Sequence, residues 1–440
     1  MWILASFRRG IVLSILISAA TAWSQQQMSS IQRERAQDIL KFTANDIKKN
    51  YYDPKLHGVD WDAAVAHARE QIAQSNSFNM AMSHIAAMID LLHDSHTFFL
   101  PPEHAYRIDY GMQYQIIGNR CFVTRVRPGS SPESKGVKPG DEILEINGYT
   151  VDRDDLWKIQ YVFNALRPQP ALTLLLKNPS GAQQQVDVNT KFHTGKLVTD
   201  LTGANDFSDI WGLIRDEETQ EHLLRARYAE YGNDLLVIKV PEFAFSQDEV
   251  DNMIAKARKH TNLILDLRGN PGGDVDTLKY LVAGIFDKEV KIADRVGRKE
   301  NKPETAKPRH PFDGKIEVLV DASSASAAEV FARIVQLEKR GIVIGDKTSG
   351  AVMEARHIDE KMGADTVIYY GVSVTDADLI MSDGKSLENV GVTPDEMVLP
   401  SAQDLTAGRD PVLSHAAELL GAKISPEDAG KAFPYEWPPE

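Results

Sequence analysis

Three serines stand in the stretch DASSASAAEV, residues 321–330, between an apolar run and the start of a predicted helix. A serine hydroxyl becomes a nucleophile only when a neighbouring base takes its proton. The first N–H groups and the positive dipole end of a helix would stabilise a negatively charged tetrahedral intermediate at this place. Serines before a helix also serve as N-caps, which is their commoner role. The stretch therefore indicates acyl chemistry only if the chain also supplies a base.

A second turn with chemical potential is RGNPGG, residues 268–273, which follows the apolar run NLILDL and opens another predicted helix. A glycine-rich turn of this kind can expose backbone N–H groups to an anion, either a phosphate or a developing oxyanion. The turn matches neither G-x-x-x-x-G-K-[ST] nor G-x-G-x-x-G, which argues against a nucleotide. The chain also has no G-x-S-x-G elbow and no H-E-x-x-H zinc motif.

Both turns belong to an alternation of strand-like and helical segments that begins at residue 234. Apolar runs such as DLLVIKV, NLILDL, IEVLV and GIVIG are separated by amphipathic segments such as SQDEVDNMIAKARKH and SAAEVFARIVQLEKR. This order predicts an α/β domain whose helices pack on a largely parallel sheet. Sites in such sheets form at the carboxyl ends of the strands, where both turns lie. We predict this domain over residues 233–400, with a C-terminal tail at 401–440.

The first part of the chain has two further patterns. Residues 28–102 have helical periodicity, and residues 105–192 consist of short strands and turns. Within the second region, SPESKGVKPGDEILEINGYTV resembles the core of a PDZ domain, in which a peptide adds as an extra strand beside a sheet edge. The resemblance implies a peptide-binding loop at Tyr110, Gly111 and Met112, although the run YGMQ departs from the usual loop. A β-rich spacer without a peptide groove is the alternative, and residues 193–232 are interpreted only as a connecting segment.

Taken together, the two turns carry a wider resemblance. LILDLRGNPGG, VLVDASSASAAEVFA and IVIGDKTSG, with YYDPKLHGVDWDAA and LHDSHTFFLPPE nearer the N-terminus, resemble the tail-specific, C-terminal processing serine peptidases. The family motif places the nucleophile three residues before a glutamate, which here is Ser326 before Glu329. The resemblance implies an α/β (crotonase/ClpP-like) peptidase domain. It also implies an oxyanion hole made by the backbone N–H groups of Ala327 and of Gly272 or Gly273.

One position departs from the better-known members of that family. Those members use a lysine base in a Thr-x-Gly-Lys-Gly run, whereas the matching run here is TSGAV, with Ala351 at the lysine position. Alanine cannot accept a proton, and the nearby Lys347 lies off the motif and is expected to be a solvated charge. The sequence therefore requires a different base.

A second branch of the family, which includes the tricorn core protease, resembles this chain at two other places. These are a Ser-His pair, here Ser95 and His96 in HDSHT, and a glutamate in a Glu-Asn-x-Gly-Val-x-Pro-Asp run, here Glu388 in LENVGVTPD. A histidine with a reference pKa of about 6.5 can be neutral near pH 7 and accept the Ser326 proton. Glu388 and the Ser95 hydroxyl would then orient the imidazole. A structural histidine that caps the helix is the alternative for His96.

The composition of the 440 residues, 42% hydrophobic and 25% charged, is that of a globular protein of more than one domain. The first 22 residues combine two arginines, a short apolar core and an Ala-x-Ala pair, which predicts a cleavable signal peptide and a secreted or periplasmic protein; an uncleaved anchor is the alternative. The net charge of −14 argues against nucleic acid and anionic membranes as partners. A lone cysteine, Cys121, cannot form an intrachain disulfide, and no Cys/His metal spacing is present.

We therefore expect a multidomain α/β protein that acts as an exported serine endopeptidase on protein or peptide substrates, without a cofactor or metal. Ser326 would attack the peptide bond, His96 would serve as base, and Glu388 with Ser95 would orient it. Two alternatives remain at this stage: a catalytically inactive, peptide-binding adaptor, and an esterase or lipid binder on the same fold. The sequence does not predict the oligomeric state.

Overall fold

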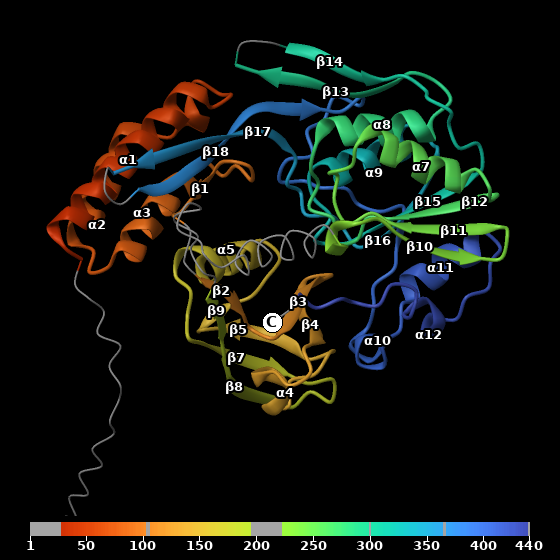
Figure 1. The fold of residues 1–440 in the computed structure, drawn as a ribbon, viewed down its shortest axis with the longest axis horizontal. Helices are drawn as coiled ribbons and strands as arrows, with labels where there is room; N and C mark the ends of the chain where they lie inside the picture. The colour runs from red at the N-terminus through yellow and green to blue at the C-terminus, as the bar shows by residue number, and fades with distance from the viewer. Residues whose placement is uncertain (1–27, 103–105, 195–221, 299–300, 364–366, 439–440) are drawn as a thin grey trace, which may run out of the picture.

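The computed structural model describes residues 28–102, 106–194, 222–298, 301–363 and 367–438 (Figure 1). The predicted signal peptide at 1–22 and most of the connecting segment at 193–232 lie outside these ranges. Within them, no helix is long and apolar enough to cross a membrane. The predicted multidomain α/β architecture is confirmed: N-terminal helices, a β-rich domain and an α/β domain follow one another along the chain.

The N-terminal region is three helices that pack on two long strands from the C-terminal half of the chain. The first helix starts with a capping box, in which the Ser29 hydroxyl accepts from the Gln32 N–H and the Gln32 side chain accepts from the Ser29 N–H. The apolar faces of the helices surround Phe99 and meet the inner face of the long strands. Figure 1 shows this arm of paired strands reaching from the α/β domain to the helices. The elements are α1 (Ser30–Asn50), α2 (Trp61–Gln74), α3 (Phe78–Asp90), β1 (Phe98–Leu100), β17 (Met353–Met362) and β18 (Ile368–Ile380).

The β-rich domain is built on an antiparallel sheet in the order β3-β4-β5-β7-β8, with β6 paired to β5. Among the described strands β3 pairs only with β4, so one edge of β3 is open to a further strand. A short helical stretch lies beside β3. The elements are β2 (Tyr106–Asp109), β3 (Met112–Ile117), β4 (Arg120–Val126), α4 (Ser131–Ser134), β5 (Glu142–Ile146), β6 (Tyr149–Thr150), α5 (Leu156–Tyr161), the π-helical turn Val162–Leu166, β7 (Ala171–Lys177), β8 (Gln183–Asn189) and β9 (Lys191–Thr194).

The α/β domain has a six-stranded sheet in the order β10-β11-β12-β15-β16-β19, in which all neighbours from β11 to β19 run parallel. Its central strands are apolar along their whole length because both faces of the sheet are covered. A second sheet, β1-β18-β13-β14, carries the arm. The elements are β10 (Arg227–Tyr231), β11 (Leu235–Lys239), α7 (Gln247–Ala257), β12 (Asn262–Asp266), α8 (Val275–Ile285), β13 (Val290–Gly297), β14 (Asn301–Ala306), β15 (Lys315–Val320), α9 (Ala327–Leu337), β16 (Gly341–Gly345) and β19 (Glu396–Met397).

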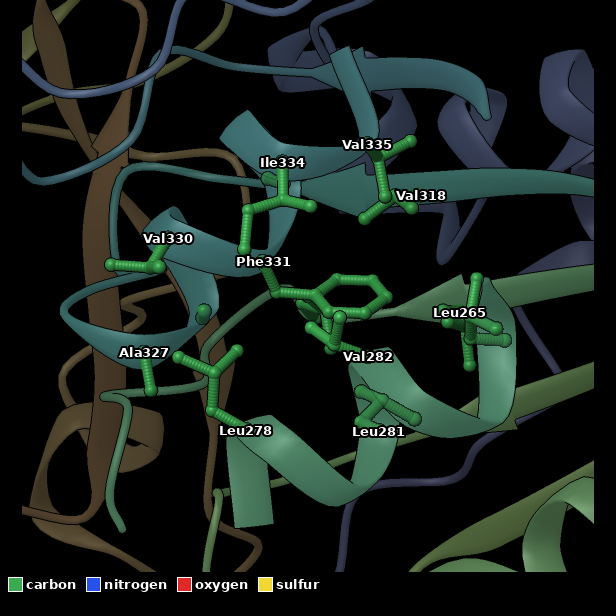
Figure 2. Packing of buried hydrophobic residues seen from close by; sticks show 14 of the residues in the cluster. Leu265, Leu278, Leu281, Val282, Val318, Ala327, Val330, Phe331, Ile334 and Val335 are labelled. Carbon is green, nitrogen blue, oxygen red and sulfur yellow. The ribbon is translucent and has the colours of Figure 1, made fainter. Parts of the chain in front are cut away.

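Helices α8 and α9 cover one face of the parallel sheet. Phe331 on α9 lies between Val282 of α8 and the strand residues Leu265 and Val318 (Figure 2). These side chains are fully or almost fully buried, so the start of α9, which directly follows Ser326, rests on a close-packed core.

The opposite face of the sheet is covered by the C-terminal region, which the sequence analysis described only as a tail. Residues 401–438 form α10 (Ala402–Ala407), α11 (Pro411–Leu419) and α12 (Pro426–Ala429), followed by a segment without regular structure. Val412, Leu413 and Ala416 of α11 pack on Leu319 of β15 and complete this second core layer. The helices were not predicted because each is short and starts at a proline or serine cap, which gives little periodicity to detect.

Candidate active site

Ser326 sits at the residue before α9 in a strained backbone conformation. Its φ of 53° and ψ of −121° fall in a region that side chains rarely adopt. The Ser326 N–H is held by the Ala351 carbonyl at 2.8 Å and by the Glu329 carboxylate at 3.1 Å. These contacts hold the Ser326 backbone in place at the start of the helix.

The two other serines of the stretch have structural positions. Ser324 is fully buried, and its hydroxyl donates to the Leu267 carbonyl at 2.9 Å. Ser323 is exposed at the turn, where its N–H donates to Asp321. Of the three, Ser326 is the one whose hydroxyl meets a histidine.

His96 reaches Ser326 because β1, which follows it, pairs with β18 of the arm. The turn that carries His96 is held by the buried Asp94, whose carboxylate accepts from the backbone N–H groups of His96 and Thr97, both at 2.9 Å. The same carboxylate accepts from Tyr51 at 2.9 Å and from Thr375 on β18 at 2.6 Å. The imidazole Nε2 lies 3.3 Å from the Ser326 Oγ, within reach of proton transfer.

Ser95 and Glu388 continue the chain of hydrogen bonds on the far side of the imidazole. The Ser95 Oγ donates to a Glu388 carboxylate oxygen at 2.8 Å and lies 2.8 Å from the His96 Nδ1. Because the Ser95 proton points at the carboxylate, the Ser95 oxygen accepts from the Nδ1–H. This tautomer leaves Nε2 unprotonated and facing Ser326, as a general base requires.

The carboxylate of Glu388 is itself held in place by backbone groups. It accepts from the N–H of Ser95 and the N–H of Val352, each at 2.8 Å. Burial raises the pKa of Glu388, while these hydrogen bonds oppose that shift. Burial also lowers the pKa of His96, partly offset by the nearby Asp94 charge and reinforced by His357. The imidazole is therefore kept in its neutral, proton-accepting form.

Two backbone N–H groups beside Ser326 could stabilise an oxyanion. The Gly272 Cα lies against the nucleophile, since a Cβ there would come 2.6 Å from the Ser326 Cβ, and Gly272 has φ +99°. Its N–H already donates to the Asn270 side chain at 2.8 Å. Within the described part of the chain, the N–H groups of Gly273 and Ala327 donate to no other residue. The geometry therefore favours Gly273 over Gly272 as the partner of Ala327.

Glu329 links the nucleophile to the loop that carries Ala351. Its carboxylate is fully buried and accepts from four donors: the Thr348 hydroxyl at 2.5 Å and the N–H groups of Gly350, Ala351 and Ser326 at 2.8–3.1 Å. Burial raises its pKa to about 7, against the effect of these hydrogen bonds. Ala351 thus contacts Ser326 through its backbone, and its side chain supplies no base.

Several residues of the site had no assigned role in the sequence analysis. Asp94, Thr375 and Tyr51 hold the His96 turn, and Asn270 shapes the glycine-rich turn by donating to the Val240 carbonyl at 2.8 Å. Asp94 stands next to the predicted pair in HDSHT, so its position offered a signal. Thr375 offered none, because its contact depends on the pairing of two distant strands. Within the described residues, no group of three or more His, Cys, Asp or Glu could hold a metal ion.

The residues predicted for peptide binding lie at the start of β3. Tyr110 and Met112 are buried, and the Gly111 N–H donates to Asp109 at 2.7 Å and is therefore occupied. A groove of about 640 Å³ runs between β3 and α5, lined by side chains that include Met112, Gln113 and Gln160. This groove follows the open edge of β3.

Comparison with known proteins agrees with this architecture. Residues 234–398 match the model of peptidase family S41, and residues 107–160 match that of the PDZ domain. A "Probable CtpA-like serine protease" of Staphylococcus epidermidis is 23% identical over 431 residues, covering 93% of this chain and 76% of that protein. The tail-specific protease of Haemophilus influenzae is 23% identical over 373 residues, covering 76% of this chain and 50% of that protein.

Solved structures share the fold at low sequence identity. Mature CPAF complexed with lactacystin superposes with a TM-score of 0.63 at 17% identity, covering 89% of this chain and 98% of that chain. The photosystem II D1 C-terminal processing protease has a TM-score of 0.51 at 17% identity, covering 89% of this chain and 99% of that chain. Both likenesses describe the fold alone.

Proposed function

Because the chain is an S41-family serine peptidase with a PDZ domain, of the C-terminal processing or tail-specific type, we propose that it cleaves unfolded or C-terminally presented protein substrates with Ser326 as nucleophile and His96 as general base. The observation that carries this proposal is the unbroken hydrogen-bond chain from the Ser326 Oγ through His96 and Ser95 to Glu388. It supplies the base that Ala351 cannot.

The proton path follows from this chain. As the Ser326 Oγ bonds to the peptide carbonyl carbon, its proton passes to the His96 Nε2. The imidazolium is stabilised by its Nδ1–H bond to Ser95, whose own proton points at the Glu388 carboxylate. When the C–N bond breaks, Nε2 returns the proton to the leaving amine. A water molecule then hydrolyses the acyl-enzyme, with His96 again taking and returning a proton.

The carbonyl oxygen becomes an oxyanion during both attacks. The N–H groups of Gly273 and Ala327 lie on the two turns that flank Ser326 and are available to donate to it. The positive dipole end of α9, an 11-residue helix, points to the same place. Removal of one such donor in other serine peptidases costs about 10²–10³-fold in kcat.

Substrate presentation is assigned to the PDZ domain. The open edge of β3 offers unpaired backbone groups, and a peptide that adds there would lie in the groove beside α5. We further propose that the protein is exported through the segment at 1–22, which an N-terminal sequence of the mature protein starting near Trp23 would support.

The test uses the mature chain, an unfolded protein substrate, and the variants Ser326→Ala, His96→Ala and Ala351→Lys. We expect cleavage by the parent chain, a fall of at least about 10³-fold in kcat for the first two variants, and no gain for the third. Ser323→Ala, which changes an exposed serine of the same turn, is the control and should cleave normally. Equal cleavage by the parent and His96→Ala would refute the histidine mechanism. A gain of activity in Ala351→Lys would point to a lysine-type site.

A further inference from the structure

The last described residues of the chain form an irregular segment that runs between the PDZ domain and the peptidase domain. This segment, residues 433–438 (FPYEWP), follows the short helix α12. The rings of Tyr435 and Trp437 pack edge to face with centroids 4.9 Å apart. The two aromatic residues are separated by one position along the segment.

These two rings face two arginines of the PDZ domain, Arg125 on β4 and Arg127 directly after it. The Arg125 guanidinium lies 4.8 Å from the centroid of the Tyr435 ring, and the Arg127 guanidinium lies 4.8 Å from that of Trp437. Both terminal nitrogens of Arg127 also donate to the Pro438 carbonyl at 3.1 Å. Asp109 orients Arg127 through an ion pair at 2.9 Å. Arg127 is buried, which strengthens a cation–π contact relative to an exposed one.

The same segment also contacts the peptidase domain. Arg227 on β10 donates to the Pro434 carbonyl at 2.7 Å, and its guanidinium lies 5.6 Å from the centroid of the Phe433 ring. Arg225, just before β10, pairs with Glu436 at 3.1 Å. One short segment therefore contacts arginines of two different domains.

The PDZ domain has a second contact with the peptidase domain beside the active site. The Gly118 N–H, in the turn between β3 and β4, donates to Asp346 at 2.7 Å. Arg153 donates to the same carboxylate at 2.9 Å and to the Lys347 carbonyl at 2.9 Å. The chain continues from Lys347 into the loop whose N–H groups bind Glu329 and whose Ala351 carbonyl accepts from Ser326.

We propose that residues 433–438 act as a strap that keeps the PDZ domain docked on the peptidase domain and thereby keeps the loop beside Ser326 in its catalytic arrangement. The strap is bound by four arginines, at positions 125, 127, 225 and 227. These four arginines suit a peptide that carries both aromatic rings and a carboxylate. The effect on catalysis rests on the proposed function, whereas the docking role does not.

The experiment uses the full chain with the double change Tyr435→Ala and Trp437→Ala. We expect hydrogen exchange of the Gly118 amide to accelerate by about tenfold or more, because two cation–π contacts are lost. We expect kcat on an unfolded substrate to fall by about the same factor, with KM for a short peptide unchanged. The matched control is Tyr149→Ala with Tyr369→Ala, which removes two exposed aromatic rings elsewhere and should change neither quantity.

A synthetic peptide of residues 431–438 provides the second arm. Added to the double variant, it should bind, slow the Gly118 exchange again and restore kcat, and an additional Arg127→Ala change should abolish these effects. Unchanged Gly118 exchange in the double variant would overturn the proposal, and so would a rise in kcat. If the parent chain cleaves nothing, the proposed function fails, but the exchange and peptide-binding results still decide whether the strap exists.

Discussion

The backbone of Ser326 is held in a conformation that suits glycine, with φ 53° and ψ −121°. Side chains there cost of the order of 1–3 kcal/mol, which the surrounding contacts must offset. In this conformation the hydroxyl lies 3.3 Å from the His96 Nε2. A glycine at this position would adopt the same backbone without the cost.

We therefore predict that Ser326→Gly is inactive but more stable than Ser326→Ala by about 1 kcal/mol. Both variants lack the hydroxyl, so the difference isolates the backbone strain. Chemical denaturation followed by circular dichroism measures it. An alanine variant as stable as the glycine variant would mean that the positive φ carries no cost.

The pH dependence of activity follows from the environment of His96. Its pKa is lowered mainly by burial, so the imidazole loses its proton below the ordinary value. The base must be neutral, and activity should therefore rise with pH through a midpoint below about 6.5 and stay high through pH 7. The kcat/KM profile of the free enzyme reports this midpoint.

Asp94→Asn offers a check on that assignment. Removal of the anion that raises the His96 pKa should move the acid midpoint further down, provided the turn keeps its backbone contacts. An upward shift of this midpoint would show that the acidic side of the pH profile reports the titration of another group. Glu133→Gln, a carboxylate on the PDZ surface, should leave the midpoint unchanged.

At the scale of elements, β15 carries an unusual buried acid. Glu317 is 4% exposed on the central strand, and one of its carboxylate oxygens has no hydrogen-bond partner among the described residues. Burial, with the nearby charges of Glu396 and Asp395, raises its pKa to about 7. The folded chain therefore binds this proton more tightly than the unfolded chain does.

The sign of the pH effect follows from that difference. Below the ordinary pKa of 4.5 both states are protonated, and as pH rises through about 7 the folded state loses stability relative to the unfolded state. We predict that Glu317→Gln stabilises the peptidase domain by about 1–2 kcal/mol at pH 8.5 and much less at pH 5. Water in the pocket that Glu317 lines screens its charge and keeps this gain in stability small. Denaturant midpoints at both pH values measure it, with the exposed Glu418→Gln as control; a pH-independent difference would contradict the assignment.

The strands and helices of the parallel sheet could be predicted from sequence because each strand is a continuous apolar run between turn residues. The hairpins β13–β14 and β17–β18 could not be predicted in the same way. Their strands carry charged residues on an exposed side, and the buried residues of β18 pack against distant elements that include α1 and β1. The pairing of β18 with β1 joins segments far apart along the chain and leaves no local pattern.

The same limit applies to the site. The candidate site residues were identified by their resemblance to known motifs and not by periodicity. The fold brings all four, Ser326, His96, Ser95 and Glu388, into one hydrogen-bonded chain. Their catalytic roles stay predictions until the variants are assayed. The choice between Gly272 and Gly273 depended on which N–H is already occupied, a fact that only the folded turn contains.

At the scale of the whole molecule, the PDZ domain is bound to the peptidase domain at both the strap and the active-site loop. The second contact centres on Asp346, which is largely buried and accepts from both Arg153 and the Gly118 N–H. A buried, charge-assisted contact of this kind is costly to break, because the partner left behind remains without compensation. Asp346 begins the loop that binds Glu329 and Ser326. A change in the PDZ domain should therefore alter the position of the nucleophile, even where the changed residue does not contact the substrate.

We predict that Arg153→Ala lowers kcat by about five- to tenfold. Binding of a peptide to the β3 groove, measured by fluorescence anisotropy on the inactive Ser326→Ala background, should stay the same. Asp346→Asn should act similarly, and the double variant should be no worse than Asp346→Asn alone, because the two side chains act through one contact. Arg120→Ala, which removes an exposed PDZ arginine paired with Glu142, is the matched control and should leave kcat unchanged. Strictly additive losses would mean that Arg153 affects catalysis by another route, and an unaltered kcat would mean that the PDZ domain is a passive neighbour of the active site.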